Sequence, residues 1–329
     1  MKRIVVVTLV VVVVLSSGFA WSSCSGRTDS VVVAWSPFES TALLWIAEDR
    51  QFFGRNGLDV TLRKYDTGAG TLDGMLKGEA DIATGVAEFP VVSRAFRKEK
   101  MRIMGNADKA EFIYLIGRRD RGIEEVSDLK GKRVGTTFGT VAHFHLGRFF
   151  NLHGVNTNDV TLVDVKTPEE WVNAVANGDI DAIATAQPYA SSAEDRLGAN
   201  AVVWPAQSGQ LLYGLIISSD GWVTNHPELA GRFLKSLAQA EEYLISNPTE
   251  AKAIVQKRLN LDAAYVEAFW PQNQFALSLD QSLIVAMEDE ARWMISNNLT
   301  TENQVPNFLD YIYEDALKGI KPGAVNIIR

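Results

Sequence analysis

Short apolar runs alternate with longer amphipathic stretches over the first two-thirds of the chain. Runs with strand character lie at 31–35, 59–65, 80–85 and 101–105, and helical periodicity is found at 40–53 and 70–78. The same order returns at 132–186. Strand followed by helix, repeated along a chain, predicts parallel sheets with crossover helices. The pattern therefore predicts two α/β lobes of Rossmann-like type.

The two lobes are predicted to be copies of one unit. Asp59–Leu62 (DVTL) recurs one hundred residues later at Asp159–Leu162, and further identities recur at the same offset. These are Thr67 with Thr167, Gly78 with Gly178, Asp81 with Asp181, Leu115 and Ile116 with Leu215 and Ile216, and Asp120 with Asp220. Self-similarity at a fixed offset indicates repeated structure. We expect the lobes to superpose with Asp81 over Asp181, each in the turn before the third strand of its lobe.

The segments at 112–120 and 212–220 end the two copies, so we expect them to be long strands forming a two-strand hinge. After Asp220 the pattern becomes almost purely helical, which predicts covering helices that return to the first lobe. The expected fold class is α/β, with two Rossmann-like lobes, this hinge, and a helical C-terminal extension packed on lobe 1. Lobe 1 is expected to comprise 30–115 plus 217–329, and lobe 2 to comprise 116–216.

The N-terminus has the order of an export signal: positive, apolar, then small. Lys2 and Arg3 precede an apolar run from Ile4 to Leu15 that Thr8 alone interrupts. A bilayer-spanning helix needs about 20 apolar residues, so a signal peptide over 1–23 is favoured.

Cys24, the only cysteine, follows a segment (WSSC) that is similar to a lipobox. We expect it to carry a lipid anchor, followed by a tether over 24–29. Ordinary signal peptidase cleavage after Ala20 is the alternative.

The net charge of the chain indicates which kinds of partner it is suited to bind. The whole chain carries −8, and removal of Lys2 and Arg3 with the signal leaves −10 on 306 residues. An acidic exported surface argues against nucleic acid. No basic amphipathic stretch indicates membrane binding beyond the lipid.

Four ordered segments resemble those of the solute-binding proteins of ABC importers, in the group typified by nitrate, sulfonate, taurine and thiamine-precursor binders. They are FFGRNGLDVTLRKY (52–65), LKGEADIATG (76–85), VSDLKGKRVGTTFGT (126–140) and VANGDIDAIATAQPY (175–189). The resemblance implies a periplasmic binding protein of type II, whose lobes close on one small molecule. It also implies delivery of that molecule to a membrane permease driven by an ATPase, with no cofactor.

Ligands of open α/β sheets bind beyond the carboxyl ends of the strands, near helix N-termini, and here two such edges should face each other. The candidate ligand residues lie near the ends of predicted strands or in the loops that follow them: Trp35, Ser36, Glu39, Thr41, Asp66, Thr67, Gly68, Ala69, Val86, Glu88, Thr137, Phe138, Gly139, Thr140, Gln187, Tyr189 and, inside the predicted strand 212–220, Tyr213. Trp35 is expected to pack on the solute. The alternative is that the hydroxyl residues are only helix caps, the glycines only permit turns, and the aromatic rings only pack between lobes.

Three carboxylates, Glu39, Asp66 and Glu88, lie in these loops with one cation, Lys166. If they point inward, a zwitterion or cation is favoured over a plain anion; if outward, they are solvated loop charges. A small sulfonate-like or zwitterionic solute is the preferred ligand. A pyrimidine, a flavin or an amine is the alternative ligand, and a ligand-sensing module for a membrane receptor is the alternative role.

No catalytic motif points to an enzyme. The resemblance includes an enzyme that makes a thiamine pyrimidine, but that activity depends on a cysteine cluster, whereas this chain has Cys24 alone. His143 and His145 are two residues apart on a predicted helix and point to different faces, which is poor geometry for a shared metal. We expect no catalytic residue, metal or cofactor.

Overall fold

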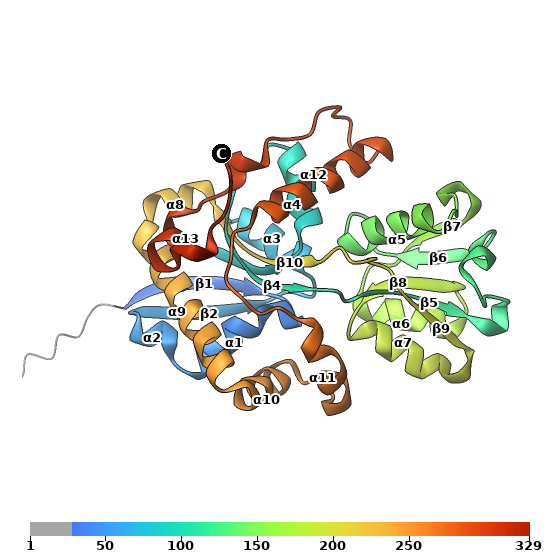
Figure 1. Ribbon diagram of the computed structural model, residues 1–329, viewed down its shortest axis with the longest axis horizontal. Coiled ribbons are helices and arrows are strands. Elements are labelled where there is room, and N and C mark those ends of the chain that lie inside the picture. Colours follow the sequence, from blue (N-terminus) through green and yellow to red (C-terminus); the bar gives the residue numbers. More distant parts are fainter. Residues whose placement is uncertain (1–27) are drawn as a thin grey trace, which may run out of the picture.

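The computed structural model describes residues 28–329, which form two lobes, each built on a five-stranded sheet (Figure 1). The signal peptide at 1–23, Cys24 and nearly all of the tether at 24–29 lie outside the described residues, so export and lipid attachment stay predictions. Within 28–329, no helix combines the length and hydropathy needed to cross a membrane.

The sheet of lobe 1 has the order β2-β1-β3-β10-β4. Its strands are β1 (Asp29–Trp35), β2 (Leu58–Lys64), β3 (Ile82–Val86), β4 (Met101–Ala110) and β10 (Leu212–Ser219). β1 pairs in parallel with β2 and β3, whereas β10 is antiparallel to both β3 and β4. The sheet is therefore mixed, and the expectation of a wholly parallel sheet is wrong at β10.

The sheet of lobe 2 repeats this topology in the order β7-β6-β8-β5-β9. Its strands are β5 (Ile113–Arg118), β6 (Arg133–Thr136), β7 (Thr161–Asp164), β8 (Ala182–Ala186) and β9 (Ala201–Pro205). β5 is the antiparallel strand here, between β8 and β9. β5 and β10 thus hold equivalent places, in agreement with their shared Leu-Ile pair one hundred residues apart.

The internal repeat is visible in matching hydrogen bonds. The Asp81 carboxylate accepts from the N–H of Val32 at 2.8 Å, and the Asp181 carboxylate accepts from the N–H of Arg133 at 2.8 Å. Each aspartate also donates its own N–H to the carbonyl of that same residue. The glycine three residues earlier has a φ of 76° in lobe 1 and 83° in lobe 2, which only glycine adopts readily. The prediction that the two turns occupy equivalent places in the two lobes is confirmed.

The chain crosses between the lobes twice, at 111–112 and at 206–211, and we call these two segments the hinge. The predicted crossing points at 115/116 and 216/217 fall inside β5 and β10. Each of these strands is paired along its length within one sheet, and they do not pair with each other. By sheet membership, lobe 1 comprises 29–110 and 212–329, and lobe 2 comprises 113–205.

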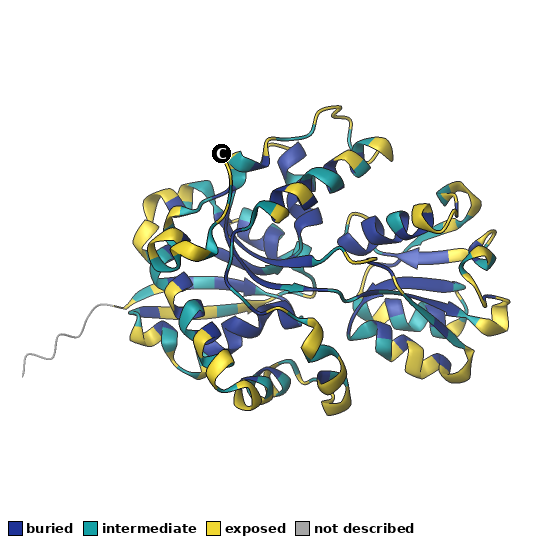
Figure 2. Ribbon diagram, in the orientation of Figure 1, coloured by how far each residue is buried: buried dark blue, intermediate teal, exposed yellow. Residues whose placement is uncertain are grey.

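Helices cover both sheets, and the C-terminal ones return to lobe 1 as predicted. The helices are α1 (Ala42–Asp49), α2 (Phe52–Arg55), α3 (Gly68–Leu76), α4 (Glu88–Phe96), α5 (Val141–Leu152), α6 (Pro168–Asn177), α7 (Tyr189–Leu197), α8 (Asp220–Asn225), α9 (Pro227–Ser246), α10 (Pro248–Leu259), α11 (Ala263–Phe269), α12 (Gln281–Ser296) and α13 (Asp315–Ile320). α9 and α10 pack on α1, and α12 packs on α4. The buried faces of both sheets appear dark blue in Figure 2. The main core extends from lobe 1 onto α5 of lobe 2.

Candidate ligand-binding site

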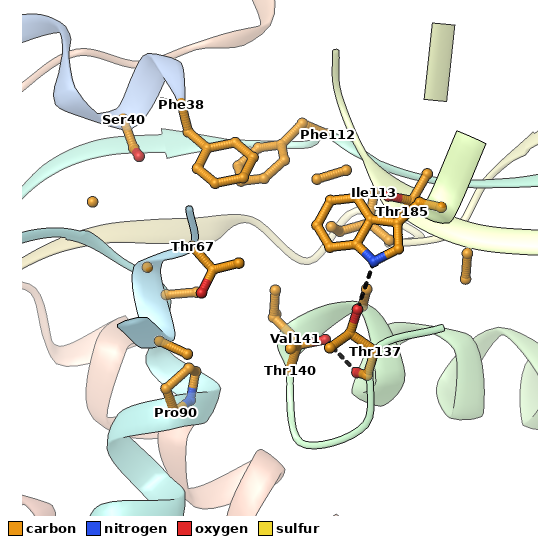
Figure 3. A pocket seen from close by; sticks show the side chains of 18 of the residues that line it. Phe38, Ser40, Thr67, Pro90, Phe112, Ile113, Thr137, Thr140, Val141 and Thr185 are labelled. Atoms are coloured by element: carbon orange, nitrogen blue, oxygen red, sulfur yellow. Dashed lines mark hydrogen bonds between the residues drawn. The ribbon is translucent and has the colours of Figure 1, made fainter. Parts of the chain in front are cut away.

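A cavity of about 90 Å³ lies between the lobes, where strands of both sheets end (Figure 3). Its wall is built from the 3-10 turn before α1, the starts of α3, α4 and α5, the ends of β3 and β8, one residue of α6, one residue of the hinge, and the starts of β5 and β10. The lining residues are Phe38, Ser40, Thr67, Gly68, Ala69, Gly85, Ala87, Pro90, Phe112, Ile113, Thr137, Thr140, Val141, Ala142, Trp171, Ala184, Thr185, Ala186 and Tyr213. Both lobes therefore contribute to one binding space.

Six of the candidate residues from the sequence line this cavity: Thr67, Gly68, Ala69, Thr137, Thr140 and Tyr213. Thr67 also caps α3, since its hydroxyl accepts from the N–H of Gly70 at 3.1 Å. The capping and lining interpretations are therefore compatible for this residue. The hydroxyl of Thr140 instead donates to the carbonyl of Thr137 at 2.7 Å, a bond drawn in Figure 3.

Trp35 does not line the cavity. Its ring lies edge-on to Trp45, with centroids 4.6 Å apart, and Lys64 lies over it at 5.8 Å. The alternation of β1 turns this side chain toward α1. Phe38, three residues later, takes the place in the cavity wall that was expected for Trp35.

Other candidates lie behind the cavity wall or away from it. Ser36, Thr41 and Val86 are buried inside lobe 1. Phe138 is 42% exposed and stacks on His143. Three further candidates do not line the cavity either: Gly139 forms a turn with φ 75°, Asp66 is exposed, and Tyr189 packs edge-on against Trp171.

Sequence reasoning missed Trp171, the residue of α6 that reaches the cavity. Its indole N–H donates to the Thr137 hydroxyl at 2.8 Å and to the Val165 carbonyl at 3.0 Å. A tryptophan directly after the capping box of a helix that follows a strand was the available signal. Thr185 was missed too, because it lies inside β8 and not in the loop that follows this strand. The residue lines the cavity, and its buried hydroxyl has no hydrogen-bond partner within 28–329.

Two helices from opposite lobes begin at the cavity. Gly68 and Ala69 start α3, and Val141 and Ala142 start α5. The first N–H groups of a helix have no intrahelical partner, and the helix dipole places positive potential at that end. Helix N-termini therefore favour an anionic group without needing a charged side chain.

The described lining residues include no charged side chain. Asp66 points to solvent, and Lys166 pairs with Asp164 with its side chain 68% exposed. Burial raises the pKa of Glu88 to about 8, so this carboxyl is neutral at pH 7, and its oxygen accepts from the N–H of Tyr213. Neither Asp66 nor Glu88 therefore presents a charge to the cavity, so these two acids give no reason to expect that it repels anions.

A second, smaller pocket of about 10 Å³ shares Phe38, Ser40 and Phe112 with the cavity. This volume holds about one water molecule or a group of similar size. Glu39 and Gln187, both candidates from the sequence, line it. The Glu39 carboxylate accepts from the Tyr265 hydroxyl, and burial raises the pKa of Glu39. Within 28–329 no cation pairs with Glu39, and no cluster of three metal-ligating side chains is found.

Residues 39–251, well over half of the chain, match the protein family described as NMT1/THI5 like. The chain belongs to this family. A protein of Bacillus subtilis, provisionally named an aliphatic sulfonates-binding protein, is 24% identical over 79% of this chain and 80% of its own length. The taurine-binding periplasmic protein of Escherichia coli is 25% identical over 71% and 72%.

Solved structures share the fold of this NMT1/THI5-like protein. The alkanesulfonate-binding protein SsuA of Xanthomonas axonopodis, bound to MOPS, superposes with a TM-score of 0.75 at 18% identity, covering 87% of this chain and 98% of that one. The chain is thus a two-lobed α/β protein of the periplasmic binding protein type II fold. Its relatives place it with solute-binding proteins.

Enzymes also occur among the similar proteins. The 4-amino-5-hydroxymethyl-2-methylpyrimidine phosphate synthase of Aspergillus parasiticus is 22% identical over 66% of each chain. The desulfurization enzyme DSZB superposes with a TM-score of 0.65 at 17% identity, covering 90% of this chain and 99% of that one. In the present chain, the lining residues that the structure describes include neither cysteine nor histidine.

Proposed function

We propose that the protein is an extracytoplasmic solute-binding protein that encloses a small organic molecule between its lobes and delivers it to an ABC permease and its ATPase. The preferred solute is sulfonate- or taurine-like, or another small zwitterion. The observation that carries this proposal is the uncharged cavity walled by both lobes, with the N-termini of α3 and α5 opening into it. No catalytic role is proposed.

The cavity has separate places for the parts of such a solute. An anionic head fits at the two helix N-termini, with the hydroxyls of Thr67 and Thr185 as donors. An alkyl portion fits against Phe38, Phe112 and Trp171. The ammonium of a zwitterion fits toward Glu39, whose buried carboxyl pairs with no cation among residues 28–329.

The same aromatic side chains favour a second candidate, a flat ring such as a pyrimidine or flavin stacked in the cavity. An amine held near Glu39 alone is a third. A ligand-sensing module for a membrane receptor would use the same site, and a neighbouring permease and ATPase in the genome would distinguish import from sensing.

Binding of the solute is tested by a thermal-shift screen of ethanesulfonate, taurine, nitrate, a pyrimidine, riboflavin and putrescine. A ligand at 100 times its dissociation constant stabilises by about 2.7 kcal/mol. For a chain of this size we expect the melting temperature to rise by several degrees with a sulfonate. A rise with riboflavin or putrescine alone would contradict the preferred solute class.

Thr185→Val is expected to weaken binding of the solute found in this screen about tenfold, because the variant removes a buried, unpartnered hydroxyl from a residue that lines the cavity. Folding should be preserved, since that hydroxyl has no protein partner. Thr136→Val is the matched control: its hydroxyl is equally buried and unpartnered within 28–329, but does not line the cavity. Isothermal titration of both variants checks this. Equal affinities would remove Thr185 from the site.

Export and anchoring belong to the same proposal. Mass spectrometry of the protein from its native host should find a lipidated N-terminus at Cys24. A mature chain that begins at Trp21 would contradict the anchor and leave a freely secreted protein.

A further inference from the structure

Helix α12 of the C-terminal extension contacts lobe 2 outside the cavity. The Trp293 ring lies edge-on to two residues of α5, Phe144 with centroids 5.5 Å apart and His143 with centroids 5.3 Å apart. It also contacts Phe89 of α4, in its own lobe, at 5.8 Å. Phe89 and Phe144 are fully buried and stack on each other across the lobes. One indole therefore joins a helix of each lobe.

A glycine on α5 makes this approach possible. A β-carbon at Gly147 would lie 2.5 Å from Cζ2 of Trp293, closer than real contacts allow. Arg148, the next residue, forms an ion pair with Asp289 of α12. Both partners are partly exposed, so this pair adds little, and the aromatic contact dominates.

The contact is continuous with the cavity wall on both sides. On α5, Val141 and Ala142 line the cavity, and the next two residues touch Trp293. At α4, Ala87 and Pro90 line the cavity, and Phe89 between them touches Trp293. The way in which α4 and α5 pack on the indole therefore determines how far apart the two sides of the cavity lie.

We propose that Trp293 is a positioning residue of the solute site, a latch that holds lobe 2 in the closed position without touching the solute. This inference rests on the proposed function for its effect on affinity, but the effect on lobe position is independent of any ligand. When only a fraction of the molecules is closed, the apparent dissociation constant rises by the inverse of that fraction.

The test compares Trp293→Ala with Trp293→Phe and with Trp222→Ala, which removes a half-buried tryptophan on the remote helix α8. Small-angle scattering of the ligand-free protein should give a larger radius of gyration for Trp293→Ala, near-normal values for Trp293→Phe, and no change for Trp222→Ala. With taurine as the probe, the dissociation constant of Trp293→Ala should rise about tenfold, mainly through a faster off-rate.

Gly147→Ala disturbs the same contact from lobe 2, because the added β-carbon would clash with Trp293. This variant should therefore also increase the radius of gyration of the ligand-free protein. If Trp293→Ala and Gly147→Ala fold with an unchanged radius of gyration, the latch is wrong whatever the solute is. If neither taurine nor ethanesulfonate binds the wild type, the preferred sulfonate-like solute fails, but the scattering result still decides the latch.

Discussion

Replacing Gln207 by alanine is expected to cause the largest loss of stability of any single hinge substitution. The side chain is 1% exposed, and its oxygen accepts from the N–H groups of Phe112 and Ile113 at 2.6 and 2.8 Å. Its nitrogen donates to the carbonyls of Ala110 and Gln210 at 3.1 and 2.7 Å. One amide thus satisfies backbone groups of both hinge segments.

Alanine would leave these buried backbone groups without partners, at a cost of about 3 kcal/mol, since each unsatisfied buried group costs about 1 to 3 kcal/mol and water replaces some of the bonds. The melting temperature should fall by several degrees. Solute affinity should fall as well, because Phe112 and Ile113 line the cavity. Differential scanning calorimetry and titration with the solute measure the two effects.

Gln210→Ala is the matched control, since it removes a glutamine side chain from the same hinge segment. That side chain makes no hydrogen bond within 28–329, whereas its backbone carbonyl is one of the partners of Gln207. The control should leave both readouts unchanged. Similar melting temperatures for the two variants would show that the amide of Gln207 does not hold the hinge together.

The internal repeat was predictable because it rests on positions with a local conformational demand. Each turn needs an aspartate that accepts from the backbone of a neighbouring strand and, before it, a glycine with positive φ. The same residues are therefore found at these positions in both copies. The sequence did not predict which lobe's sheet β10 joins. Residues 212–219 are as apolar as their counterparts in β5, and only long-range pairing decides which lobe each strand joins.

The candidate site was predictable at the level of loops but not of side chains. Strand ends and helix starts converge between lobes, so Thr67, Gly68 and Thr137 lie where the sequence placed them. Which neighbour faces the cavity depends on the twist and alternation of each strand end. For this reason Phe38 lines the cavity and Trp35 does not.

A pair of buried carboxyls, Glu88 on α4 and Glu290 on α12, gives the second large prediction. Both are fully buried, and three of their four oxygens have no partner within 28–329. Burial raises the pKa of Glu88 to about 8 and that of Glu290 well above its ordinary value, and each acid opposes ionisation of the other. Asp289 raises the pKa of Glu290 further, and Arg148 lowers it.

The sign of the pH dependence follows from these shifts. Below about pH 4.5 both acids are protonated in the folded and in the unfolded chain, so their burial does not lower the free energy of unfolding through ionisation. As the pH rises toward 8, the unfolded chain releases protons that the folded chain keeps, and stability falls by about 1.4 kcal/mol per pH unit for each proton. His145 acts oppositely, because burial lowers its pKa to about 3, and its effect is confined to pH values below about 6.5.

Between pH 6.5 and 8 the carboxyls therefore dominate, and Glu88→Gln should be more stable than the wild type, with a flatter dependence of melting temperature on pH. Glutamine keeps the shape of the side chain and the acceptor for the N–H of Tyr213, but has no proton to lose. The gain at pH 8 should reach several degrees, whereas at pH 4.5 the two proteins should melt alike. Glu228→Gln, at an exposed position of α9, should change neither value. A wild type whose melting temperature rises from pH 6.5 to 8 in parallel with that of Glu88→Gln would mean that Glu88 is ionised in the folded protein.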